Sequence, residues 1–161
     1  MKNWLKIIST IIIVLVADLV TKYFLFDVDY FNLIPHVISI ASNGGNTGAA
    51  FGIFTGKTVT LAIVSVLMIV ALFIFNHFVK NKSTLYCISF GFIVGGALGN
   101  LYDRLFLRFV RDFIYLDFFP SFPTFNVADS FLCIGAVLLA IYIIFFYGKN
   151  PKQKTNDTDK K

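Results

Sequence analysis

Residues 58–105 read TVTLAIVSVLMIVALFIFNHFVKNKSTLYCISFGFIVGGALGNLYDRL, two apolar runs separated by the short polar segment KNKS. Each run is long enough to cross a bilayer as a helix, which takes about 20 predominantly apolar residues. Because the connection between them is so short, the two helices are expected to be antiparallel neighbours. This stretch therefore predicts a helical hairpin within a membrane.

Two further apolar segments flank the hairpin. The chain has 161 residues, of which 57% are hydrophobic and 20 are Phe, and its mean hydropathy is +0.77. A soluble domain of this size could not bury so much apolar surface. We therefore expect an all-α integral membrane protein with four transmembrane helices and a small extracytoplasmic, partly β loop region. The predicted spans are Leu5–Leu25, Thr58–Val79, Thr84–Leu105 and Phe125–Tyr147.

The distribution of charge predicts the orientation of these spans. The N-terminus, the turn at residues 80–82 and the tail from residue 149 hold nine of the 14 Lys and Arg residues, and basic loops stay in the cytoplasm. Both termini are thus expected inside the cell and the two long connections outside, with short β pairing in Leu33–Ile40. Residues 1–148 would form the membrane domain, and residues 149–161 a disordered, basic cytoplasmic tail.

Polar residues interrupt the apolar segments at one predicted depth. Asp18 and Lys22 are four residues apart on one helical face and can form an ion pair there. Asp103 and Arg104 at the end of the third span are expected to compensate each other in the same way. Since the helices alternate in direction, the ends of the first and third spans lie level with the start of the fourth. Asn100 and Asn126 are the uncharged polar residues of this layer.

Asp112 and Asp129 are the two acids at this level without an evident basic partner. Arg111 adjoins Asp112 in sequence but need not face it, and no basic residue lies within one helical turn of Asp129. Ionisable groups at such positions are costly and usually serve chemistry or ion movement. Two close carboxylates can share one proton and activate a water molecule against a peptide carbonyl, as aspartic proteases do.

Other classes of function remain open at this point. Intramembrane acids and bases also occur in proton- or ion-coupled carriers, although no internal repeat supports a carrier. A membrane scaffold could use the same polar groups to join helices, but that function leaves Asp129 unexplained. The sequence has no HExxH or GxSxG pattern, and Cys87 and Cys133 have no metal-ligand spacing. A metal site made of carboxylates alone stays open, but no ligand spacing supports one.

Five sequence blocks in order resemble the lipoprotein signal peptidases, also called signal peptidase II. They are Asp18-x-x-Thr21-Lys22, residues 46–51 (NTGAAF), residues 95–104 (GGALGNLYDR), residues 110–114 (VRDFI) and residues 125–130 (FNVADS).

The resemblance implies a protease of the bacterial inner or plasma membrane that removes the signal peptide of diacylglyceryl-modified prolipoproteins, cutting before the lipidated cysteine. It implies Asp112 and Asp129 as the catalytic pair, with the active site near the outer face. A monomer is expected, with the prolipoprotein and membrane lipids as partners, no nucleic acid and no cofactor. The supporting or substrate-binding residues that it implies are Asp18, Lys22, Asn46, Gly48, Asn100, Asp103, Arg104 and Asn126.

Overall fold

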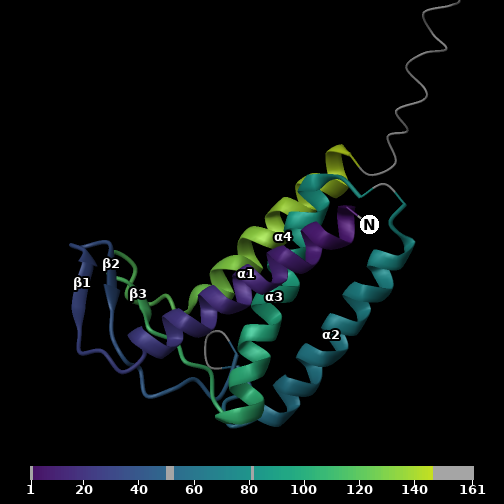
Figure 1. Ribbon diagram of the computed structural model, residues 1–161. Helices are drawn as coiled ribbons and strands as arrows, with labels where there is room; N and C mark the ends of the chain where they lie inside the picture. Colours follow the sequence, from purple (N-terminus) through teal and green to yellow (C-terminus); the bar gives the residue numbers. More distant parts are fainter. Residues whose placement is uncertain (1, 50–52, 81, 147–161) are drawn as a thin grey trace, which may run out of the picture.

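The computed structural model describes residues 2–49, 53–80 and 82–146, and the chain forms a helical bundle with a small sheet at one end (Figure 1). Four helices are long and apolar enough to cross a membrane, which confirms the predicted fold. They are α1 (Lys2–Leu25), α2 (Thr58–Phe78), α3 (Thr84–Phe106) and α4 (Val127–Phe145). The predicted tail at residues 149–161 and part of the glycine-rich loop, residues 50–52, lie outside the described residues.

Helix α3 is the centre of the bundle and packs on each of the other three helices. Small residues on α3 make this close approach possible. A Cβ atom added to Gly95 would lie 2.7 Å from Cβ of Val14 on α1, and one added to Gly96 would lie 2.5 Å from the carbonyl oxygen of Ala128 on α4. The run of small residues in the third span thus lets two helices approach α3 at one level.

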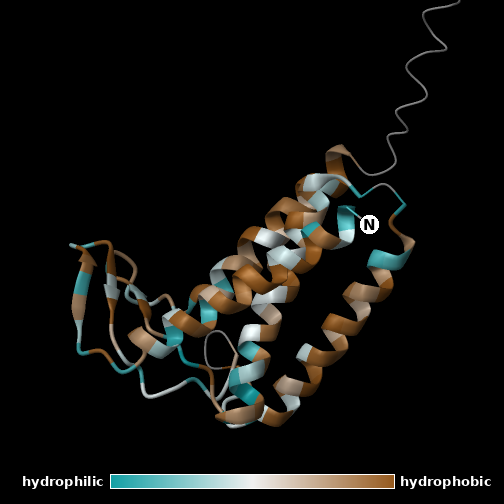
Figure 2. Ribbon diagram, viewed as in Figure 1, coloured by the Kyte–Doolittle hydropathy of each residue, from teal (hydrophilic) through white to brown (hydrophobic). Residues whose placement is uncertain are grey.

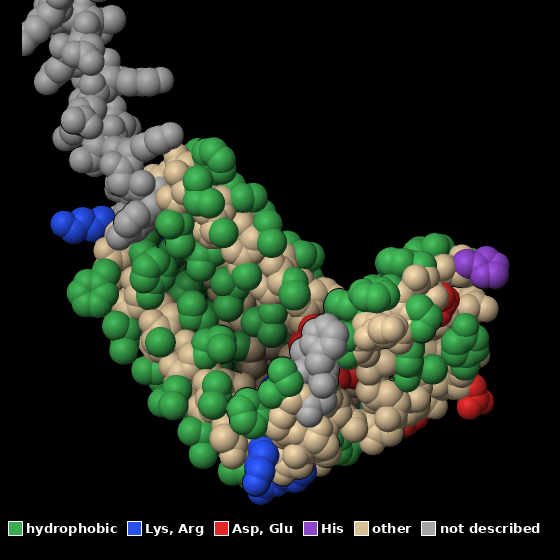
Figure 3. All heavy atoms as spheres, turned by 180° about the vertical axis from the view of Figure 1, so that it is seen from behind, with side chains coloured by type: hydrophobic (Ala, Val, Ile, Leu, Met, Phe, Trp, Pro, Cys, Tyr) green, Lys and Arg blue, Asp and Glu red, His purple; other side chains and the backbone are tan. Residues whose placement is uncertain are grey.

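The other helices direct most of their apolar side chains outward. Figure 2 shows hydrophobic residues along α1, α2 and α4, and Figure 3 shows hydrophobic side chains over much of one face of the bundle. Leu5, Leu67 and Ile144 are each more than 60% exposed. Such surface is stable only against lipid, so its position around the bundle agrees with membrane-spanning helices.

A three-stranded antiparallel sheet joins the two long connections of the chain. Strands β1 (Phe31–Ile34) and β2 (Ile38–Ile40) form a hairpin, as predicted for residues 33–40, and β3 (Ile114–Leu116) pairs with β2. The sequence did not predict β3, because three residues are too few to show a strand pattern. Strand β3 begins two residues after Asp112, so the sheet fixes the part of the chain that follows this acid.

Candidate active site

The first turn of α4 fixes the position of Asp129. Asn126 is the N-cap residue, and its side-chain oxygen accepts a hydrogen bond from the Asp129 backbone N–H at 3.0 Å. The Asp129 carboxylate in turn accepts one from the Asn126 backbone N–H at 3.2 Å, which completes a capping box. Asn-x-x-Asp before an apolar run is the sequence signal for this arrangement.

Asp112 comes from the second connection, where backbone pairing holds it in place. Asn46 and Val110 exchange two backbone hydrogen bonds of 2.8 Å, so the two long connections meet just before Asp112. The Asp112 side chain is 2% exposed, and its two carboxylate oxygens accept hydrogen bonds from the amide nitrogens of Asn46 (2.9 Å) and Asn126 (2.7 Å). These amide groups satisfy the buried carboxylate while leaving it without an ion-pair partner among the described residues.

Asn100 on α3 connects the two acids to the first helix. Its amide nitrogen donates to the Asp129 carboxylate at 2.7 Å. Its amide oxygen accepts from Nζ of Lys22 (2.9 Å) and from the Asn126 amide (3.0 Å). The predicted polar layer is therefore a continuous hydrogen-bond network across α1, α3 and α4.

Lys22 is fully buried and lies between two carboxylates. It forms the predicted ion pair with Asp18 at 2.8 Å and a second contact with Asp103 at 3.3 Å. Asp18 also accepts a hydrogen bond from the backbone N–H of Ala128 at 2.9 Å, next to the start of α4. Breaking such a buried pair from one side leaves an uncompensated charge, so the network ties three helices together.

The predicted pairing of Asp103 with Arg104 is wrong. The Asp103 carboxylate instead binds Arg111. The Arg111 guanidinium group donates to it at 2.8 Å in the shortest contact, and the Arg111 backbone N–H donates to it at 3.0 Å. Successive residues of an α-helix point in different directions, so neighbours in sequence do not face each other. The Asp103–Arg111 pair anchors the chain immediately before Asp112.

Arg104 faces the same cavity as the two acids. This cavity has a volume of about 270 Å³ and is lined by Asn46, Asn100, Arg104, Val110, Asp112, Phe122, Phe125, Asp129, Leu132 and Cys133, among others. The Nε atom of Arg104 is buried and has no hydrogen-bond partner among the described residues. Gly48 lies beside the cavity, and its backbone N–H donates to the side-chain oxygen of Asn46 at 2.8 Å. The structure therefore brings all ten predicted site residues to one end of the bundle.

The surroundings of Asp112 alter its acidity. Burial, and after it the negative charge of Asp129, raise the pKa of Asp112 from 3.8 to about 6, although the hydrogen bonds from Asn46 and Asn126 oppose this increase. Carboxyl groups that affect each other in this way lose their protons as a pair, and one proton can be shared between them. Together they can accept a proton from water and donate one to a substrate. In the described part of the chain, no group of three His, Cys or Asp side chains could hold a metal ion.

Known proteins are similar in sequence to most of this chain. The family model described as signal peptidase (SPase) II matches residues 10–145. The chain belongs to the signal peptidase II family. A lipoprotein signal peptidase from Staphylococcus aureus is 35% identical over 156 residues, which cover 92% of this chain and 90% of that one. Another, from Clostridium novyi, is 45% identical over 103 residues, or 62% of this chain and 68% of the relative.

Two solved structures of bacterial membrane enzymes have the same architecture as this chain. A structure described as a bacterial membrane enzyme, at 2.3 Å resolution, superposes with a TM-score of 0.75 at 33% sequence identity, and the match covers 96% of this chain and 93% of that one. A second, at 1.9 Å resolution, has a TM-score of 0.74 at 35% identity and covers 87% and 93%. As a member of the signal peptidase II family, the chain is a multi-pass membrane peptidase that removes signal peptides from lipoproteins.

Proposed function

We propose that Asp112 and Asp129 are the catalytic pair of an aspartic endopeptidase working within the membrane, with water as the nucleophile. One carboxylate accepts a proton from the water, whose oxygen attacks the carbonyl carbon of the scissile peptide bond. The other carboxyl group donates its proton to the carbonyl oxygen, and the tetrahedral intermediate then collapses as the leaving nitrogen is protonated. The observation that carries this proposal is that both acids line one cavity and are bound by the same residue, Asn126.

The polar side chains around the pair act by holding it in place. Asn46 and Asn126 orient Asp112, and Asn100 orients Asp129, each through an amide hydrogen bond of 2.7–2.9 Å. Lys22 orients Asn100 and is itself fixed by its carboxylate partners. Catalytic groups need this kind of support because small displacements reduce the rate severely.

Arg104 is a proposed contact to the substrate backbone, and Gly48 is proposed to shape the loop beside it. The buried Nε of Arg104 needs a hydrogen-bond acceptor, and a peptide carbonyl in the cavity would supply one. A Cβ atom at Gly48 would lie 2.9 Å from the carbonyl oxygen of Ile53, so only glycine allows the loop to fold this closely beside the cavity. The loop containing Gly44 and Gly45 would clamp the extended segment of substrate around the scissile bond.

The proposed substrate is a prolipoprotein whose cysteine carries a diacylglyceryl group, with cleavage immediately before that cysteine. Val110, Leu132 and Cys133 give the cavity an apolar side, which suits a lipid-modified residue. The acyl chains would remain in the bilayer beside the bundle. Because one chain supplies the whole site, the enzyme is proposed to act as a monomer, without a cofactor.

The proposed orientation places both termini in the cytoplasm and the catalytic pair near the outer face of a bacterial plasma membrane. It rests on the excess of Lys and Arg at the opposite end of the bundle. A reporter that works only in the cytoplasm should be active when it is fused after residue 161. Activity of a reporter that works only outside the cell would reverse the proposed orientation.

The catalytic assignment is tested with purified protein in detergent micelles and a diacylglyceryl-modified prolipoprotein, with the products identified by mass spectrometry. Asp112→Asn and Asp129→Asn should each slow cleavage by about 10⁴-fold or more, because an amide cannot take or give the required proton. Asp29→Asn is the matched control, since Asp29 is an exposed acid of the first long connection, and it should cleave normally. Normal cleavage by either cavity variant would exclude this catalytic pair.

A further inference from the structure

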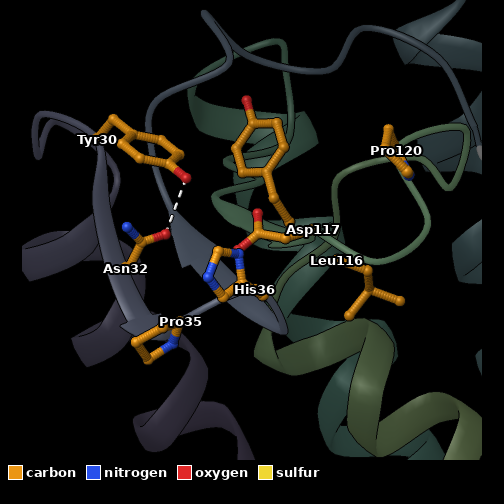
Figure 4. Close-up of a pocket in the computed structure, with 8 residues that line it drawn as sticks. Tyr30, Asn32, Pro35, His36, Leu116, Asp117 and Pro120 are labelled. Carbon is orange, nitrogen blue, oxygen red and sulfur yellow. Dashed lines mark hydrogen bonds between the residues drawn. The ribbon is translucent and has the colours of Figure 1, made fainter.

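A second cavity lies on the sheet, separate from the proposed catalytic pair. Its volume is about 400 Å³, within the range of about 300–1,000 Å³ that is usual for ligand sites. Figure 4 shows Tyr30 and Asn32 on one side of it and Leu116 and Pro120 on the other, with Asp117 between them. We refer to this cavity as the sheet pocket.

Asp117 gives the sheet pocket a negative charge. One of its carboxylate oxygens accepts a hydrogen bond of 2.6 Å from the hydroxyl group of Ser39, which is fully buried in β2. No basic side chain lies within ion-pair distance of this carboxylate in the part of the chain that the structure describes. Residues 26–41 and 113–122, which include the residues that line the pocket, contain three Asp, no Lys or Arg and one His, His36, which forms part of the lining. The local field therefore favours a cation.

Aromatic and amide groups complete a surface suited to a cation. Tyr30 and Tyr115 line the pocket, and the faces of aromatic rings attract ammonium and guanidinium groups. The strand register places Asn32, Ser39 and Tyr115 side by side across the sheet. The Tyr30 hydroxyl donates to the side-chain oxygen of Asn32 at 2.9 Å, as Figure 4 shows, so the wall of the pocket is held in place.

The position of the pocket indicates the source of the cation. Asp112 and Asp117 are the two ends of the segment that contains β3, and an extended chain covers five residues in about 16 Å. A substrate segment running beside this strand from the cavity that holds Asp112 and Asp129 would reach the pocket about five residues after the cleaved bond. That part of the substrate leads away from the membrane, in the orientation proposed above.

We propose that the sheet pocket binds a Lys or Arg side chain of the substrate about five residues after the cleavage site. This inference rests on the proposed function. The ammonium or guanidinium group binds the Asp117 carboxylate, and the rings of Tyr30 and Tyr115 flank it. The enzyme thereby prefers prolipoproteins with a basic residue in this part of the mature sequence.

The test compares diacylglyceryl-modified prolipoproteins that differ at one position, with Lys, Gln or Glu placed four, five or six residues after the cut. For the wild-type enzyme, kcat/KM should be about tenfold higher with Lys than with Glu at the best position, mainly through KM. In Asp117→Asn this ratio should fall close to one. Asp29→Asn removes the same charge from the neighbouring connection, at a residue that does not line the pocket, and should keep the ratio.

A second variant protects the test against misfolding of the first. Tyr30 is 63% exposed, so Tyr30→Leu removes one wall of the pocket with little effect on the fold, and it should reduce the ratio by about threefold. Equal kcat/KM values for Lys and Glu substrates with the wild-type enzyme would overturn the inference, as would an equal loss of preference in Asp29→Asn and Asp117→Asn. If the wild-type enzyme cleaves none of the substrates, the proposed function itself fails. Cleavage of all of them with equal efficiency rejects only the role of the pocket.

Discussion

Substitution of Asn126 separates two contributions of one side chain, because Asn126 both caps α4 and binds Asp112. Asn126→Ala removes the N-cap, worth about 1 kcal/mol, and a hydrogen bond to a buried carboxylate, worth about 1.5–3 kcal/mol. The free energy of unfolding should therefore fall by about 3 kcal/mol. Cleavage should slow by about 100-fold, because Asp112 loses one of the two groups that orient it.

Asn126→Ser retains a good N-cap residue but has no amide group to reach Asp112. It should recover about 1 kcal/mol of the lost stability in thermal melts and almost none of the lost activity. The pKa of Asp112 should rise further above about 6 in both variants, because the missing hydrogen bond favoured the ionised carboxylate. Infrared difference spectra recorded across a pH titration measure this change.

Asn76→Ala is the matched control for Asn126→Ala. Asn76 is 1% exposed and accepts a hydrogen bond of 3.1 Å from the Tyr86 hydroxyl at the opposite end of the bundle. The loss of this hydrogen bond in Asn76→Ala should lower the free energy of unfolding by about 1–3 kcal/mol without slowing cleavage by the folded protein. Normal kcat in Asn126→Ser, or an equal loss of kcat in Asn76→Ala, would refute the assignment of Asn126 as a positioning residue.

Three further predictions concern the charges and the packing around the proposed site. As the pH rises from 3.8 to about 6, the free energy of unfolding should fall by up to about 3 kcal/mol relative to that of Asp112→Asn. The reason is that Asp112 in the folded protein retains a proton that the unfolded chain releases. Parallel curves of stability against pH for the two proteins would contradict this prediction. Gly99→Ala should cost about 1–3 kcal/mol in thermal melts, because its Cβ would collide with the carboxylate of Asp18; an unchanged melt would show that α1 and α3 can separate without penalty. Lys22→Met should lower the free energy of unfolding by about 3–5 kcal/mol, because it leaves Asp18 unpaired, whereas Asp103 keeps Arg111 as a partner. Adding Asp18→Asn should restore part of this stability. A double variant no more stable than Lys22→Met would argue against the ion pair.

Much of the site could be predicted because it depends on helical spacing and helix direction. Asp18 and Lys22 are one helical turn apart, so their ion pair follows from the sequence. Antiparallel helices bring Asn100 to the level of Asn126, which the observed hydrogen bond of 3.0 Å bears out. The partner of Asp103 could not be predicted in this way, because Arg111 reaches it only after the chain leaves α3 and turns back.

The sequence by itself determined the membrane bundle, since apolar runs of this length exclude water and force the backbone into helices that satisfy their own hydrogen bonds. It also placed the acids at one level, because helix length sets depth. Only the tertiary structure decided which groups meet. Strand β3 pairs with β2, and backbone hydrogen bonds between Asn46 and Val110 join the two connections. These contacts bring Asp112 to the N-terminus of α4. Such contacts join residues far apart in the chain, and their geometry depends on the whole fold rather than on any local pattern.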